Sequence, residues 1–209
     1  MDWLDLVEIF TLVTGVIYLI LEILQKKEMW IVGFFSALAA VIAFSSEKLF
    51  ASMGLNIYYL SISVLGYISW KQDSQRLSDL NSEHAQDIEE NGNSSNKKIH
   101  LNKLHTSTVL ISLAVLIAGT IILSFILKQV DDPRYILDAV IAILSAIATY
   151  WLTKSYIHQW TIWIVADLLS AYLCFTNAMP WMGILYLFYS LSAIYGYFHW
   201  KKNGLYISN

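Results

Sequence analysis

The segment YIHQWTIWIVADLLSAYLCF, residues 156–175, is apolar and long enough to cross a bilayer, yet it carries a carboxylate, Asp167, near its middle. On a helix, Trp160, Trp163 and Asp167 are spaced i, i+3 and i+7 and share one face. A charge at that depth costs about 2.5–3.5 kcal/mol on insertion scales, so we expect a partner or a function for it. Two indoles beside a buried carboxylate favour binding of a flat, cationic, aromatic solute.

The composition is typical of a membrane protein. Of the 209 residues 57% are hydrophobic and only 14% are charged, and the mean hydropathy is +0.54. A soluble domain is about 25% charged. The one cysteine, Cys174, excludes an intrachain disulfide. The first apolar segment lacks the basic region and cleavage site of a signal peptide, so we expect it to be retained.

Seven apolar runs predict an all-α polytopic membrane protein with seven transmembrane helices. The predicted spans are residues 3–24, 29–44, 49–70, 105–127, 135–152, 156–175 and 181–200. Residues 71–103 are too polar to form a core, which predicts a disordered loop. The predicted domains are a first three-helix repeat (1–70), a polar cytoplasmic loop (71–104), a linking helix (105–128) and a second three-helix repeat with the C-terminal tail (129–209).

The basic residues predict the orientation of the chain in the membrane. Ten of the 13 Lys and Arg residues fall on one side of the seven-span arrangement, five of them in the polar loop. Lys48, Lys128 and Arg134 fall on the other side. The positive-inside rule therefore places the C-terminus in the cytoplasm and the N-terminus outside.

The chain repeats itself at an offset of 130 residues. GYISWKQ, residues 66–72, and GYFHWKK, residues 196–202, close the third and seventh spans alike. Three spans, one linking span and three more spans give two triplets of the same orientation. This 3+1+3 arrangement is the parallel-repeat architecture of some transporters, which bind their solute near the midplane between the repeats.

The central acidic residue breaks this repeat. Asp167 aligns with Ala37 and Trp163 aligns with Gly33, so only the second triplet carries the indole pair and the charge. Shared positions are expected to be structural, and a binding site is expected where the two triplets differ.

W-x-x-W followed four residues later by a polar residue, within two triplets around a linking helix, resembles the PnuC vitamin transporters. The resemblance covers nearly the whole chain except the polar loop. It implies a SWEET-like fold and facilitated diffusion of a B-type vitamin. It also implies a homotrimer, and a cytoplasmic vitamin kinase that traps the solute without direct contact.

The resemblance also bears on the vitamin. Members that carry nicotinamide riboside are expected to have Asn where this chain has Asp167. The carboxylate favours the thiamine-carrying (PnuT) branch, because it accepts a hydrogen bond from the aminopyrimidine or faces the thiazolium cation. Nicotinamide riboside, which is also a flat cation, is the alternative solute.

Further polar groups are candidates to complete the substrate-binding site. With Trp160, Trp163 and Asp167 they are Asn56, Tyr150, Ser170, Tyr186 and Tyr189. Glu22 and Asp138 lie near helix ends, where hydration lowers their cost, and are expected to be interfacial. The same is expected of Trp3, Trp70 and Trp200.

The motifs of an enzyme are missing from the sequence. It has no H-x-x-x-H, no G-x-S-x-G, no nucleotide-binding glycine loop and no cysteine pair, so no metal and no cofactor is expected. The expected partners are the cationic vitamin and the lipid bilayer, and no nucleic acid. The alternative from another class is a non-transporting membrane subunit that binds a ligand or supports assembly.

Overall fold

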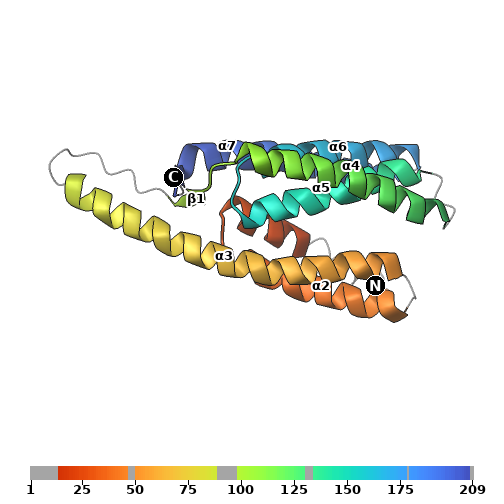
Figure 1. The fold of residues 1–209 in the computed structure, drawn as a ribbon, viewed down its shortest axis with the longest axis horizontal. Coiled ribbons are helices and arrows are strands. Elements are labelled where there is room, and N and C mark those ends of the chain that lie inside the picture. The colour runs from red at the N-terminus through yellow and green to blue at the C-terminus, as the bar shows by residue number, and fades with distance from the viewer. Residues whose placement is uncertain (1–13, 47–49, 89–97, 130–133, 178, 208–209) are drawn as a thin grey trace. The chain divides into compact units, whose positions relative to one another are not determined.

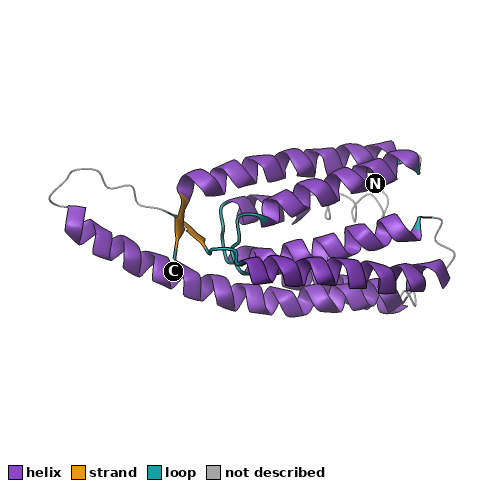
Figure 2. Cartoon of the chain, turned by 45° about the horizontal axis from the view of Figure 1, so that its top comes forward, coloured by secondary structure: helices purple, strands orange, loops and turns teal. Residues whose placement is uncertain are grey.

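The computed structural model describes residues 14–46, 50–88, 98–129, 134–177 and 179–207 of the chain (Figure 1). Helices dominate this described part, as Figure 2 shows, and there are seven of them with two short strands. They are a helical segment Thr14–Ile23, α2 (Glu28–Ser46), α3 (Phe50–Ile88), β1 (Ile99–Leu101), α4 (Thr106–Gln129), α5 (Tyr135–Thr153), α6 (Gln159–Thr176), α7 (Pro180–Asn203) and β2 (Gly204–Tyr206). The chain divides into two compact units, Met1–His100 and Leu101–Asn209.

The helices confirm the predicted all-α fold, with one correction. The long helix α3 does not end near residue 70 but continues to Ile88. Residues 71–88 were expected to be disordered because their composition is polar, but a polar sequence without Pro or Gly continues a helix that is already nucleated. Residues 89–97 of the predicted loop, and residues 3–13 of the first predicted span, lie outside the described residues.

The helix surfaces are those of a membrane protein. No residue of α4 is buried, and its side chains Leu110, Ile111 and Phe125 are 61%, 64% and 66% exposed. By length and composition α4 and α5 can each cross a bilayer. Hydrocarbon covers such apolar surface, whereas water would leave it as a very large exposed patch.

Several hydroxyl groups on the helices are satisfied within their own helix. Ser63 Oγ donates to Tyr59 O at 2.7 Å, Thr149 Oγ1 donates to Ser145 O at 2.8 Å, and Ser192 Oγ donates to Phe188 O at 2.9 Å. These bonds to the preceding turn let a polar side chain lie in hydrocarbon, where no water replaces a missing partner.

In the first unit, a tight turn joins the helical segment Thr14–Ile23 to α2. Gln25 lies at its centre with φ of 51°. Its side chain bonds both backbone groups of His100: Nε2 donates to His100 O at 2.8 Å and Oε1 accepts from His100 N at 2.8 Å. The turn is thereby fastened to the strand β1.

In the second unit, the turn between α5 and α6 has the same form. Ser155 has φ of 54° and lies 130 residues after Gln25. Its carbonyl accepts from the N–H of Asn102 at 3.2 Å, and Asn102 Nδ2 donates to Lys154 O at 3.0 Å. A left-handed residue that is not glycine is uncommon, so its recurrence at the repeat offset supports the internal repeat.

In each unit, the tryptophan that follows the turn packs against a second tryptophan from the next helix. Trp30 meets Trp70 edge to face, with ring centroids 5.3 Å apart and planes at 79°. Trp160 meets Trp200 in the same way, at 5.4 Å and 87°. Trp70 and Trp200 are therefore fully buried. The expectation that they are interfacial anchors was wrong, because each is enclosed by its partner indole.

A glycine lets each indole approach the next helix closely. A Cβ added at Gly196 would lie 2.6 Å from Cη2 of Trp160, and one at Gly66 would overlap the ring of Trp30. Both glycines begin the repeated G-Y-x-x-W-K sequence. The repeat is thus visible inside each unit, while the 3+1+3 arrangement of the two triplets stays a prediction.

Candidate functional site

Helix α6 carries four of the predicted site residues, and it packs against both α5 and α7. Trp160, Asp167 and Ser170 are buried, and Trp163 is half-buried. The helical spacing predicted from the sequence therefore holds, and one face of α6 directs an acid and aromatic rings into the second unit.

Asp167 is a buried carboxylate, 8% exposed. In the described part of the chain no basic side chain lies within ion-pair distance of it, and no hydrogen bond to its carboxylate is seen. Its charge reaches Tyr186 and Tyr189 on α7, whose rings meet edge to face with centroids 6.2 Å apart. The acid thus lies within electrostatic range of two phenols and keeps its capacity to accept hydrogen bonds.

Trp163 adds a donor one helical turn before the acid. Its indole Nε1 is buried and has no hydrogen-bond partner among the described residues. A buried polar group without a partner costs free energy, which a bound ligand can recover by accepting from it. Trp163 and Asp167 together offer an aromatic face, a donor and a charged acceptor.

Trp160 has different surroundings. It is 1% exposed and packs against Trp200 and Gly196, as Trp30 does against Trp70 and Gly66. The contact is common to both units, and it fixes α6 against α7. This geometry favours a positioning role for Trp160, and its predicted contact with solute stays a prediction.

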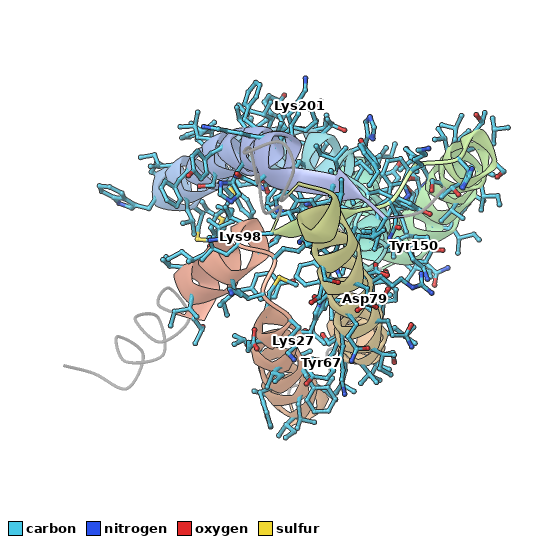
Figure 3. The ribbon with its side chains drawn as sticks, turned by 90° about the vertical axis from the view of Figure 1, so that its left-hand side faces the viewer. Lys27, Tyr67, Asp79, Lys98, Tyr150 and Lys201 are labelled. Carbon is cyan, nitrogen blue, oxygen red and sulfur yellow. The ribbon has the colours of Figure 1, made fainter. Side chains whose placement is uncertain are left out.

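The remaining predicted residues lie in varied surroundings. Ser170 Oγ donates to Ala166 O at 2.8 Å and keeps its lone pairs as acceptors. Tyr150 is an exposed residue of α5, labelled in Figure 3. Asn56 is half-buried on α3 of the first unit. The structure thus places Trp163 and Asp167 one turn apart on α6, which packs against the α7 helix that carries the two tyrosines.

One acidic residue was misjudged from the sequence. Glu22, expected to be interfacial, is buried and only 5% exposed. Its position three residues before the Gln25 turn suggested hydration, but the close approach of neighbouring side chains covers it. An aromatic residue four positions earlier, Tyr18, repeats the spacing of Trp163 and Asp167 and was the signal available in the sequence.

A groove of about 190 Å³ opens in the first unit between α2 and α3, lined by Trp30, Ile31, Phe34, Ser63, Val64, Tyr67 and Ile68. Its lining is almost entirely apolar, which is what a lipid-facing surface requires. Across the residues that the structure describes, no group of three or more His, Cys, Asp or Glu could hold a metal ion.

Comparison with known proteins extends these observations to a family. The sequence pattern of the family described as "Nicotinamide mononucleotide transporter" matches residues 5–202. The chain is similar to the nicotinamide riboside transporter PnuC of Neisseria mucosa, with 23% identity over 197 residues, covering 91% of this chain and 70% of that protein. It is similar to the protein of the same name from Haemophilus influenzae, with 23% identity over 144 residues, 69% of this chain and 56% of that one.

A solved structure agrees with this match. The crystal structure of the vitamin B3 transporter PnuC is similar with a TM-score of 0.63 and 22% identity, over 91% of this chain and 78% of that one. The similarity supports the all-α membrane fold. Because the family pattern spans nearly the whole sequence, the chain belongs to the nicotinamide mononucleotide transporter family of membrane proteins, as its resemblance to PnuC implied.

Proposed function

We propose that this protein takes up nicotinamide riboside across the bacterial inner membrane by facilitated diffusion. Both curated relatives carry that solute in their names, which supports the alternative solute of the sequence analysis over thiamine. The observation that carries a cationic solute, whichever vitamin it is, is the buried carboxylate of Asp167, which has no basic partner in the described part of the chain.

The side chains around Asp167 in the second unit suit nicotinamide riboside chemically. A pyridinium ring is flat and positive, so it stacks on the indole of Trp163 and is attracted to its face. The carboxylate of Asp167 either faces the ring charge or accepts a hydrogen bond from the carboxamide N–H or a ribose hydroxyl. Tyr186 and Tyr189 supply hydroxyls that both donate and accept.

The same acid selects against the phosphorylated form of the solute. A mononucleotide adds a phosphate of about two negative charges, and like charges repel strongly where water is excluded. Asp167 therefore favours the riboside cation over the mononucleotide, although the family is described by the latter.

Transport of a cation needs no coupling ion in this proposal. A membrane potential of 100 mV is worth about 2.3 kcal/mol per charge, and a tenfold gradient is worth about 1.4 kcal/mol. An inside-negative potential alone then accumulates the solute some tens of times, and a cytoplasmic kinase traps it. The orientation with the C-terminus inside, and a homotrimer, belong to this proposal and stay predictions.

The test is binding by the purified protein, followed by uptake into proteoliposomes. Isothermal titration calorimetry with nicotinamide riboside, the mononucleotide and thiamine separates the solutes. We expect binding of the riboside only. Binding without uptake would favour the alternative, a non-transporting ligand-binding subunit.

Variants of Asp167 locate the site. Asp167→Leu removes both charge and acceptor, and we expect it to lower the affinity for the riboside at least about tenfold. Asp167→Asn keeps an acceptor oxygen and should retain most of the riboside binding. The matched control is Glu28→Gln, which removes an exposed acid at the start of α2. Unchanged affinity in Asp167→Leu would contradict the site.

Thiamine is the second candidate, and the residue that favours it is again Asp167. A carboxylate accepts from the aminopyrimidine amine better than an amide oxygen does. If thiamine is the solute, Asp167→Asn should weaken thiamine binding sharply. If the protein bound thiamine and not the riboside, thiamine would take the place of the riboside as the proposed solute, and the proposal of a transporter would stand.

A further inference from the structure

The groove between α2 and α3 in the first unit lies within two predicted membrane spans. It has a volume of about 190 Å³, and all of its lining residues come from these two helices. Three of them, Ile31, Val64 and Ile68, are 44%, 45% and 48% exposed. An open apolar groove at this depth accommodates a segment of a lipid acyl chain, because hydrocarbon is the surrounding solvent.

One end of the groove is basic. There α2 packs against α3 so closely that a Cβ added at Gly66 would overlap the ring of Trp30. Lys27 begins the turn that leads into Trp30, since its carbonyl accepts from the Trp30 N–H at 3.1 Å. Tyr67 lines the groove directly after Gly66, and the exposed Lys71 follows one helical turn later on α3. Figure 3 labels Lys27 and Tyr67 on this unit.

The charges at this end favour an anion. The turns at residues 26–30 and 67–73 carry the lysines Lys26, Lys27 and Lys71 and one exposed acid, Glu28, while the acid Asp73 is buried. In the predicted orientation this end faces the cytoplasm, where the surface of the leaflet is anionic. An excess of lysines beside an apolar groove complements a lipid that has a negative headgroup.

The second unit provides an internal comparison. Lys71 aligns with Lys201, whose Nζ lies 6.0 Å from the ring centroid of Tyr197, so a lysine beside a tyrosine is part of the repeat. Lys27, in contrast, aligns with Ile157, which is buried. The first unit therefore has an additional cation at the aligned turn.

We propose that the α2–α3 groove of the first unit binds one anionic phospholipid. Its acyl chain lies along the apolar lining, and its phosphate accepts hydrogen bonds from the ammonium of Lys27 and the hydroxyl of Tyr67. The inference goes beyond the proposed function, because the lipid site does not depend on which solute is transported.

The test is native mass spectrometry of the purified protein in detergent, which counts the lipids that each chain retains. The probes are phosphatidylglycerol and phosphatidylcholine with identical acyl chains. We expect the wild type to retain one phosphatidylglycerol in preference to phosphatidylcholine. Lys27→Gln should weaken the binding of phosphatidylglycerol about fivefold and leave phosphatidylcholine unchanged. The matched control is Lys154→Gln, which removes an exposed charge from the corresponding turn of the second unit.

A second variant tests the groove without changing a charge. Val64→Phe fills the groove with a larger apolar side chain, and we expect it to weaken the binding of both lipids. The aligned residue of the second unit is Ile194, which is 39% exposed, and Ile194→Phe should leave both lipids unchanged. Both positions are exposed and apolar, so a phenylalanine there does not overpack the interior.

Three outcomes would overturn the inference. The first is equal retention of both lipids by the wild type, which would mean that the headgroup is not recognised. The second is unchanged retention of phosphatidylglycerol in Lys27→Gln and Val64→Phe. The third is a changed oligomeric mass in Val64→Phe with unchanged lipid retention, which would assign the groove to contact with another copy of the chain. The solute titrations of the Asp167 variants are separate measurements, so none of these outcomes alters the proposed function.

Discussion

The two compact units have the same scaffold and different interiors. Both have a left-handed residue at the turn, a crossed pair of indoles and a glycine beneath one of them. Only the second unit has Trp163 and Asp167 on its middle helix, and only the first has Tyr18 and Glu22 on the helix before it. The comparison teaches that the repeated positions hold helices together, and that the proposed site lies where the two units differ in sequence.

The largest loss of stability is expected when the glycines Gly66 and Gly196 are substituted. These variants test whether the two units have the same helix packing. Gly196→Ala places a Cβ 2.6 Å from the Trp160 ring, and Gly66→Ala does the same to Trp30. Overpacking costs about 1–3 kcal/mol, so both variants should lower the free energy of unfolding in mixed micelles by similar amounts. Gly54→Ala is the control, because a Cβ there has no neighbour within 4 Å. If only one of the two glycine variants lowered the free energy of unfolding, the two units would not share the same packing.

A smaller effect is expected from pH at the Gln25 turn of the first unit. Burial lowers the pKa of His100 to about 4, whereas the unfolded side chain titrates near 6.5. The unfolded chain therefore binds the proton first, and stability is lost as pH falls from about 6.5 toward 4. Asp73, with Oδ2 3.9 Å from His100 Nε2, favours the protonated ring and opposes part of this loss.

Amide hydrogen exchange locates this pH effect. Protection factors should fall with pH at the Gln25 turn, which is bonded to His100, and should hold at the Ser155 turn, which is bonded to Asn102. His100→Gln removes the titrating ring and should flatten the response. Equal loss of protection at both turns would contradict a role for His100.

The smallest change in the free energy of unfolding is expected for substitutions at the two turns. It should be stabilising at Ser155 and destabilising at Gln25. Ser155→Gly relieves the left-handed strain and removes a buried hydroxyl that has no hydrogen-bond partner among the described residues, so it should stabilise by about 1 kcal/mol. Gln25→Gly relieves the same strain but loses two bonds to His100, each worth about 0.5–1.5 kcal/mol. Unfolding in mixed micelles measures both, with Ser155→Ala as the control that keeps the strain.

Much of the fold was predictable because the length of a membrane-spanning helix can be read from its run of apolar residues. The apolar runs predicted every described helix, since a span must be apolar over about 20 residues whatever it packs against. Where that constraint ends, the prediction failed: residues 71–88 are polar, and only the structure shows that they continue α3. The partner indoles Trp70 and Trp200 were placed at the interface for a similar reason, because position in a span does not reveal what encloses a side chain.

The sequence by itself determined the membrane class, the helices, the repeat and the face shared by Trp163 and Asp167, because periodicity and composition are local properties of the chain. Only the tertiary structure decided that Trp160 is packed like Trp30, and that the space beside Gly33 is filled by Tyr18 from another helix. The burial of a side chain depends on which helices pack together. The spacing of residues along one helix does not reveal its contacts with a helix that is distant in the chain.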